Sequence, residues 1–296
     1  MSGIFKIMNG IFVSALIAVS LLGLIYASPV YAQATGEVKT ITVTGCDSFD
    51  FVWIPAGTFE MGSPLSDADH TPAEWPAHKV TISKGFWLGK TEITQDQWES
   101  VMKANPSCFK NKNDENAQNS ALDDPSGDSQ KYYSDRNSCP VENVSPADCD
   151  RFIAVLNSKE VGIFRLPSEA EWEYACRAGS ASSFYWGDVP DGEYFWYMDN
   201  ACNKPQAVRM KKPNAWGLYD MSGNISEICA DWFESAASRP DGTIDPIGPD
   251  KGEYKVVRDG NWSVRSEASR ASRRSMMKIN DKDMYTGLRL AYRPLK

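Results

Sequence analysis

Histidine is almost missing from this sequence, whose 296 residues contain only His70 and His78. One chain therefore cannot supply a site built from three histidines, which excludes a common class of metal centre. Basic residues are also in the minority, with 31 Lys and Arg against 39 Asp and Glu, so the formal charge is −8. We expect no nucleic acid partner, because binding to phosphates needs a cationic surface.

Charge is scarce at the beginning of the chain. Residues 1–32 carry one charged side chain, Lys6, followed by a short apolar run and by small residues that end at Ala32. This pattern predicts a secretory signal peptide. A membrane anchor is the alternative, but the run is short for a span of ~20 residues. We expect a periplasmic or secreted protein with no membrane span after cleavage.

Aliphatic residues are scarce in 110–138, where Asn, Asp, Ser, Lys and Gln predominate. Such a stretch cannot bury a core, so it is predicted to be a polar surface insert. Cys108 and Cys139 flank the insert, and a disulfide between them would close its neck. All seven cysteines lie between Cys46 and Cys229, and the odd number leaves at least one without a partner in the same chain.

Three helix starts are legible in the rest of the sequence. Thr94 and Ser168 each begin a capping box, with Gln or Glu three residues later. Ser145 is a third N-cap, and Pro146 follows it at the first helical position. Gly179 is a natural C-terminal cap for the last of these helices.

Strand signals are short, and the loops are rich in aromatic residues. Apolar residues predict strands within 49–59 and 78–88. After Gly179, Phe, Tyr and Trp occur among Gly, Pro, Asn and Asp without helical spacing. The sequence therefore predicts one α+β domain at 46–296, with few helices, short strands and much ordered loop, after a lead-in at 33–45.

Positive charge gathers at the C-terminal end, where 258–296 contains ten Lys or Arg and four Asp or Glu. In one interpretation these arginines pair with acidic residues of the first two helices inside the domain. In the other, Arg265, Arg270, Arg273 and Arg274 form a surface that faces an anion. The spacing of the residues does not separate the two.

Several long strings resemble one family, the formylglycine-generating enzyme or sulfatase-modifying factor superfamily. The similar segments are 51–59 with 61–63, 78–102, 140–145, 165–179, 212–233, 258–262 and 287–289. Together they cover nearly all of 46–296 in the family's order. The resemblance implies a variant of the C-type-lectin fold with little regular secondary structure.

The resemblance does not extend to the family's catalytic metal. Formylglycine-generating members bind copper(I) through two cysteines shortly after an Arg-Gly-Gly-Ser-Trp-like motif, which here is 258–262. Val264 and Ser269 stand near those two positions, and no cysteine follows Cys229. Copper(I) requires soft thiolates, so copper is not expected here. The iron-dependent relatives use three histidines, which this chain lacks.

The family's calcium loop is better preserved. Carried over by position, its ligands are the side chains of Asp220 and Glu227 and the carbonyls of Gly223 and Ile225, and Asn200 marks a second, weaker site. Such oxygen donors suit a structural calcium ion. Alternatively, Asp220 caps a turn and Glu227 pairs with an arginine.

The missing cysteines and histidines predict an exported ligand-binding or catalytically divergent member, not a copper-dependent cysteine oxidase. Its ligand would be a small molecule, a peptide or a protein. By resemblance to the family's display proteins, the ligand surface would include Trp262, Val264, Arg265, Ser269 and Arg273. A periplasmic oxidoreductase of the siderophore-maturation type is the alternative, and a true formylglycine-generating oxidase is a third. If the protein is an enzyme, the resemblance implies an oxidoreductase.

Overall fold

The computed structural model describes residues 33–110, 138–235 and 240–295. The predicted signal peptide at 1–32 lies outside these residues, as does most of the predicted insert at 110–138. The described part contains three α-helices, which are α1 (Gln95–Met102), α2 (Pro146–Asn157) and α3 (Glu169–Arg177). None of the helices in the described ranges is long and apolar enough to cross a membrane.

Each helix begins where the sequence predicts. Thr94, Ser145 and Ser168 are the N-caps, and each accepts a hydrogen bond from the backbone three residues later. All three form complete capping boxes, because the side chain three residues on accepts from the N-cap backbone in return. Helix α3 ends one residue earlier than expected, with Ala178 as its left-handed cap at φ 46° and Gly179 following it.

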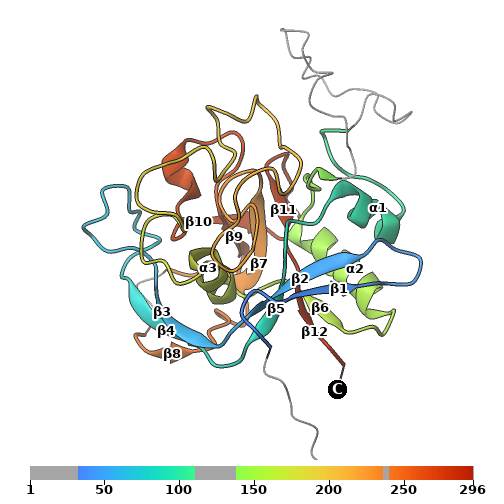
Figure 1. Cartoon of the computed structure of the whole chain (residues 1–296), viewed down its shortest axis with the longest axis horizontal. Helices are drawn as coiled ribbons and strands as arrows, with labels where there is room; N and C mark the ends of the chain where they lie inside the picture. Colours follow the sequence, from blue (N-terminus) through green and yellow to red (C-terminus); the bar gives the residue numbers. More distant parts are fainter. Residues whose placement is uncertain (1–32, 111–137, 236–239, 296) are drawn as a thin grey trace, which may run out of the picture. The chain divides into compact units, whose positions relative to one another are not determined.

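The strands form three small sheets (Figure 1). The five-stranded sheet is antiparallel, in the order β1 (Val38–Ile41), β2 (Phe49–Ile54), β5 (Phe86–Gly89), β12 (Ala291–Arg293), β6 (Ile163–Arg165). The four-stranded sheet has the order β10 (Arg274–Lys278), β9 (Tyr254–Arg258), β7 (Ser226–Trp232), β11 (Thr286–Leu288), and β7 and β11 run parallel. The third sheet has the order β3 (Gly57–Met61), β4 (His78–Ile82), β8 (Thr243–Ile244).

Strand β1 changes the predicted domain boundary. It lies in the lead-in predicted at 33–45, yet Val38 pairs with Val52 and Ile41 with Phe49 in the five-stranded sheet. The compact unit accordingly begins at Gln33, ahead of the predicted start at residue 46.

Two main cores hold these elements together. In the first, α1 and α2 pack beside the five-stranded sheet, and the rings of Trp98 and Phe152 stack with centroids 4.7 Å apart. In the second, α3 packs against β3, β4, β7 and β9, with Trp172 fully buried. The α+β prediction is confirmed.

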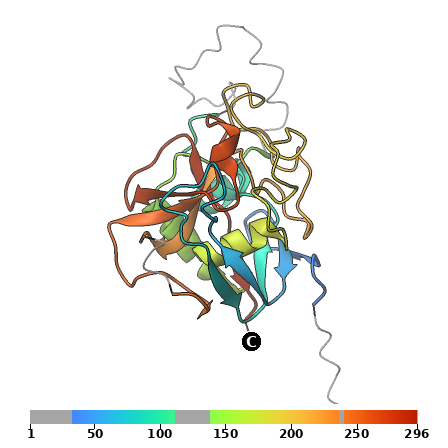
Figure 2. The ribbon, with the colours of Figure 1, turned by 90° about the vertical axis from the view of Figure 1, so that its left-hand side faces the viewer.

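The segment between α3 and β7 forms no regular element, as predicted. Figure 2 shows it in yellow and gold as a run of loops. Aromatic contacts hold these loops together in place of the backbone hydrogen bonds of a sheet. The ring centroid of Trp186 lies 4.7 Å from that of Phe184 and 4.9 Å from that of Tyr194, and both pairs are stacked. These loops bring residues 180–188 beside the segment that follows β3.

Candidate functional site

A buried ion-pair network connects α3 to the C-terminal strands. Arg258, at the end of β9, donates to Glu169 Oε1 at 2.8 Å and to Glu173 Oε2 at 2.6 Å. Arg274, at the start of β10, also pairs with Glu169. Burial alone would lower the pKa of Arg258, but Glu173 and Glu169 outweigh it and raise that pKa. The network fixes α3 against the four-stranded sheet.

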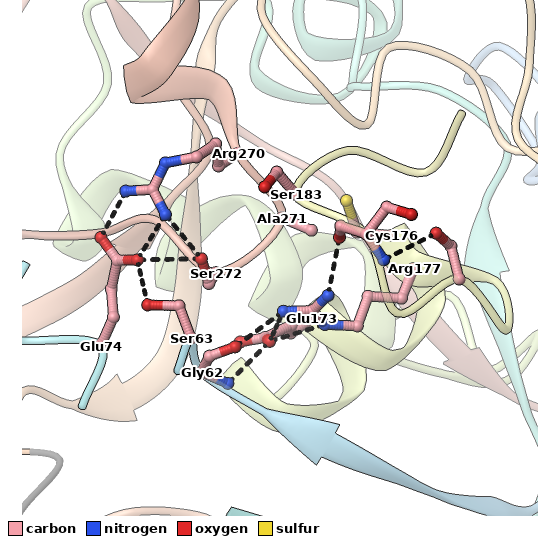
Figure 3. Close-up of polar contacts among 12 residues, drawn as sticks. Gly62, Ser63, Glu74, Glu173, Cys176, Arg177, Ser183, Arg270, Ala271 and Ser272 are labelled. Atoms are coloured by element: carbon pink, nitrogen blue, oxygen red, sulfur yellow. Dashed lines mark hydrogen bonds and ion pairs between the residues drawn. The ribbon is translucent and has the colours of Figure 1, made fainter. Parts of the chain in front are cut away.

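Glu173 also joins α3 to the loop after β3 (Figure 3). Its Oε1 accepts from the Gly62 amide at 2.9 Å and from Arg177 Nε at 2.8 Å. The Arg177 guanidinium continues to the carbonyl of Gly62 at 2.8 Å and to that of Ser182 at 3.1 Å. Arg177 therefore ties the 62–67 loop to the 180–188 loop.

Glu74 organises the other side of the same region, as Figure 3 shows. It accepts from the hydroxyls of Ser63 at 3.0 Å and Ser272 at 2.9 Å, and from Arg270 at 2.8 and 3.0 Å. Burial raises the pKa of Glu74, but the bonds from Arg270 prevail and leave that pKa lowered. Glu74 thus stays ionised and holds both serines in place.

A cavity of about 310 Å³ opens between these two groups of contacts. Its walls are polar and include five serines, which are Ser63, Ser66, Ser182, Ser183 and Ser272. Arg177, Asp67 and Asp188 also line it. The sequence analysis missed this cavity, although the serine-rich 180–183 string and Ser63 of the 61–63 motif were visible signals.

The C-terminal arginines settle one open question. Arg270 and Arg274 are buried and paired with Glu74 and Glu169, so the interpretation that pairs arginines inside the domain is confirmed for them. Their acidic partners lie in α3 and in the loop before β4, however, and not in the first two helices. The packing of α3 against the last strands explains this difference.

The structure brings together Val264 and Ser269, the two residues that the family resemblance places near the copper-ligand positions. Gly260 lies between them, because a Cβ there would collide with Ser269 Oγ and stand 2.9 Å from Val264 Cγ2. Ser269 Oγ is buried and has no hydrogen-bond partner among the residues that the structure describes. Neighbouring Ser226 donates to the Gly260 carbonyl at 3.1 Å. The residues at this point are aliphatic or hydroxylic and provide no thiolate for copper(I).

The predicted ligand surface is only partly a surface. Trp262 is 6% exposed and packs on Phe109 and Tyr285, while Ser269 is 1% exposed beside Gly260. The prediction that these two side chains are exposed is wrong. Trp262 is covered by the two aromatic rings, and Ser269 lies against Gly260. Val264 is half-buried, Arg265 is exposed, and the Arg273 side chain is 34% exposed.

In the predicted calcium loop, Glu227 has an arginine partner. Both of its oxygens accept from Arg289, at 2.7 to 3.1 Å, and Oε2 also accepts from Trp172 Nε1 at 2.6 Å. Glu227 therefore does not fit as a calcium ligand while Arg289 is bound to it. Asp220 Oδ2 accepts from the Arg209 amide at 2.8 Å. The contacts of Glu227 match the alternative interpretation, in which it pairs with an arginine.

Three further carboxyl groups lie near Glu227. Glu92, Asp220 and Asp259 are at most 3% exposed, and Glu92 accepts from the Ile225 amide and the Asn224 side chain. Burial and then the charges of Asp220 and Glu227 raise the pKa of Glu92. Burial raises the pKa of Asp220 to about 6. The loop therefore has more buried acid groups than Arg289 alone can neutralise.

The remaining predicted metal position is engaged in its own turn. Asn200 Oδ1 accepts from the Tyr197 amide at 2.9 Å, and its Nδ2 donates to the Phe195 carbonyl at 3.0 Å. Among the residues with described positions, no group of three or more His, Cys, Asp and Glu side chains is arranged to hold a metal. The predicted calcium site uses carbonyl oxygens as well as side chains, so the arrangement of side chains alone does not test it. Calcium binding by this loop stays a prediction.

The predicted disulfide is not formed, since Cys108 and Cys139 both carry thiols. The Glu142 carboxylate lies near Cys108, and burial together with the charge of Glu142 raises the pKa of the Cys108 thiol. Glu142 accepts from the Phe109 amide at 2.9 Å, and burial raises its pKa to about 7. Bonds of this kind hold the neck of the predicted insert together without a covalent link.

Comparison with known proteins places these features in a family. Residues 37–294 match the family described as the sulfatase-modifying factor enzyme 1-like domain. A chaperone protein, LppX, from Paenibacillus barcinonensis is 30% identical over 73% of this chain and 79% of its own length. A formylglycine-generating enzyme from Streptomyces coelicolor is 26% identical over 80% of this chain and 86% of its own.

A solved structure shows the same fold. Treponema denticola variable protein 1 superposes with a TM-score of 0.69 at 26% identity, over 87% of this chain and 99% of that one. The names of these relatives differ, since one is a formylglycine-generating enzyme, one a chaperone protein and one a variable protein. A shared fold does not fix the function, so the role proposed for this chain rests on its own site residues.

Proposed function

This chain belongs to the sulfatase-modifying factor enzyme 1-like family, and from that premise we propose that it is an exported ligand-binding or catalytically divergent member without copper-dependent cysteine oxidase activity. One observation carries the proposal: the side chains of Val264 and Ser269 both lie against Gly260. By the family resemblance, the two cysteines of the oxidases would stand near these two positions. Neither side chain can supply a thiolate to copper(I).

The cysteines that the chain does have support the same proposal. Cys149, Cys176 and Cys229 are fully buried, and burial raises the pKa of each thiol. The thiolate is the form that binds a metal, so these residues are poor copper ligands. Cys202 is exposed, but it lies alone on a turn.

Copper(I) binding tests this proposal directly. The purified wild-type chain should not retain copper(I) against a chelator that competes with cysteine pairs. Retention of one copper(I) per chain would contradict the proposal. Conversion of a siderophore precursor by the copper-free protein would instead favour the alternative of a periplasmic oxidoreductase.

We also propose that the loop at Asp220 binds a structural calcium ion. Its ligands would be the Asp220 carboxylate and the carbonyls of Gly223 and Ile225, and Glu227 would act only through its charge. The excess of buried acid groups over Arg289 supports a cation there, because unpaired buried charge is costly. A bound calcium ion would supply positive charge and fix the turn.

Calcium should therefore stabilise the folded chain. At about 100 times its dissociation constant, a ligand of the native state adds about 2.7 kcal/mol to the free energy of unfolding. Thermal unfolding after dialysis against a chelator should occur several degrees lower than with calcium restored, and magnesium should not replace calcium. Asp220→Asn should reduce the response to calcium. Equal melting temperatures with and without calcium would contradict the proposal.

A further inference from the structure

The cavity between the 62–67 and 180–188 loops has no part in the copper or calcium sites discussed above. It measures about 310 Å³, at the lower end of the range for small-molecule pockets. Its position is set by contacts between residues far apart in the chain, such as Arg177 with Gly62 and Arg270 with Glu74. These contacts make the cavity a pre-formed feature of the fold.

The walls offer hydrogen-bonding groups that the protein itself does not use. The hydroxyls of Ser66, Ser182 and Ser183 have no partner within the described part of the chain, and each can both donate and accept. Asp188 uses Oδ1 to accept from the Ser183 amide at 2.9 Å, which leaves Oδ2 as a further acceptor. Ser182, Ser183 and Asp188 come from the 180–188 loop, and Ser66 comes from the 62–67 loop across the cavity.

Arg177 contributes a donor in the same way. Its Nε and Nη2 groups are directed to Glu173 and Gly62, and Nη1 donates to the Ser182 carbonyl. A guanidinium has two hydrogens on Nη1, so one remains for a ligand. The guanidinium is also paired at 2.8 Å with Glu173, a carboxylate that it shares with Arg258.

The charges and surfaces of the cavity narrow the class of ligand. Asp188 is on its lining, while the other two charged lining residues are already paired, Arg177 with Glu173 and Asp67 with Arg270. An anion would therefore meet the Asp188 carboxylate. No aromatic side chain of the described ranges lines it, so a flat apolar ligand would find no stacking partner there. Mixed donors and acceptors without net positive charge fit neutral hydroxyl groups best.

We propose that this cavity binds a small neutral polyhydroxylated compound, such as a monosaccharide or a cyclic polyol. The ligand's hydroxyls would donate to Asp188 and accept from Arg177 and the three serines. The inference rests on the proposed ligand-binding function, and it names a site and a ligand class for it. Because the cavity is open and the bonds few, binding should be weak, with a dissociation constant on the order of 1 mM.

The test uses glucose, mannose, xylose and myo-inositol as probes at about 10 mM, with saturation-transfer NMR as the readout. Glucuronate and glucosamine serve as charged probes of similar size. At least one neutral probe should bind the wild-type chain, more tightly than either charged probe. Absence of binding by all four, or preference for a charged probe, would overturn the proposal.

Two variants locate the binding. Ala181→Phe fills the mouth of the cavity from an exposed position and should abolish binding. Ser183→Ala removes one hydroxyl but keeps the backbone bonds to Asp188 and Ala271, and should weaken binding about fivefold. Binding that survives Ala181→Phe unchanged would refute this location.

Two control variants test whether any loss of binding comes from the cavity itself. Ala215→Phe and Ser275→Ala make the same changes at exposed positions away from the cavity and should bind the neutral probe as the wild type does. Loss of binding in these controls would count against the site. Copper(I) binding by the wild-type chain tests the proposed function separately, so the two can fail independently.

Discussion

Replacing Arg258 with methionine should lower the free energy of unfolding by about 3–5 kcal/mol, the usual cost of removing one partner from a buried ion pair. The Arg258 side chain is fully buried and bonds to both Glu169 and Glu173. Without it, Glu169 keeps the ion pair with Arg274, and Glu173 keeps the ion pair with Arg177. The variant also loses the cation–π contact between Arg258 and Trp172, at 5.3 Å.

Urea unfolding followed by tryptophan fluorescence measures this loss. Arg265→Met is the matched control, because Arg265 is exposed, and it should unfold within about 0.5 kcal/mol of the wild type. Arg258→Lys keeps the charge but not the two-pronged geometry, so it should fall between the two. An Arg258→Met chain as stable as the control would show that the network does not hold α3 in place.

Placing cysteines at both Val264 and Ser269 should create a copper(I) site that the wild-type chain lacks. Both side chains lie within 3 Å of the place where a Cβ on Gly260 would stand. A Cys at Ser269 also replaces the buried hydroxyl with a group of similar size. Two neighbouring thiolates are the ligands that copper(I) prefers. The double variant should retain one copper(I) per chain in the presence of a chelator that strips the wild type.

The single variants V264C and S269C are the controls for this prediction. Each adds one thiol but no pair, so each should release copper(I) to the chelator as the wild type does. Since the chain already has seven cysteines, only the difference between double and single variants is informative. If the double variant binds no more copper(I) than a single one, these two positions do not correspond to the family's metal ligands.

Local features of this fold could be predicted from the sequence. The N-caps at Thr94, Ser145 and Ser168 depend on residues within one helical turn, so their signals are complete in a short window. The irregular aromatic segment before β7 was also predicted from composition. Strand β1 was not, because its pairing with β2 depends on a partner strand outside its own short sequence.

The candidate cavity could not be predicted, because its walls depend on distant contacts. Arg270 and Glu74 are 196 residues apart, and Arg177 and Gly62 are 115 apart. In each of these pairs, the local sequence around one residue does not indicate which distant residue it will contact. Sequence similarity places such residues in a family, but the pairing between them becomes visible only in the folded chain.

The contacts of Glu227 and Trp262 also could not be predicted from the sequence alone. The sequence left two roles open for Glu227, as a calcium ligand or as the partner of an arginine. Arg289, 62 residues away, occupies both carboxylate oxygens. Trp262 was predicted to face a ligand, yet it is buried against Phe109 and Tyr285. The sequence singled out both residues as candidates for the site. Their contacts depend on how the chain packs, which the sequence pattern does not show.

The most direct test of the proposed function is an assay of the wild-type chain with a peptide that carries the sulfatase cysteine motif, with copper and oxygen present. Mass spectrometry should find the cysteine unchanged, because Val264 and Ser269 cannot hold the copper that the oxidation needs. A formylglycine-generating enzyme assayed in parallel confirms that the peptide can be converted. Formation of the aldehyde by the wild-type chain would contradict the proposal.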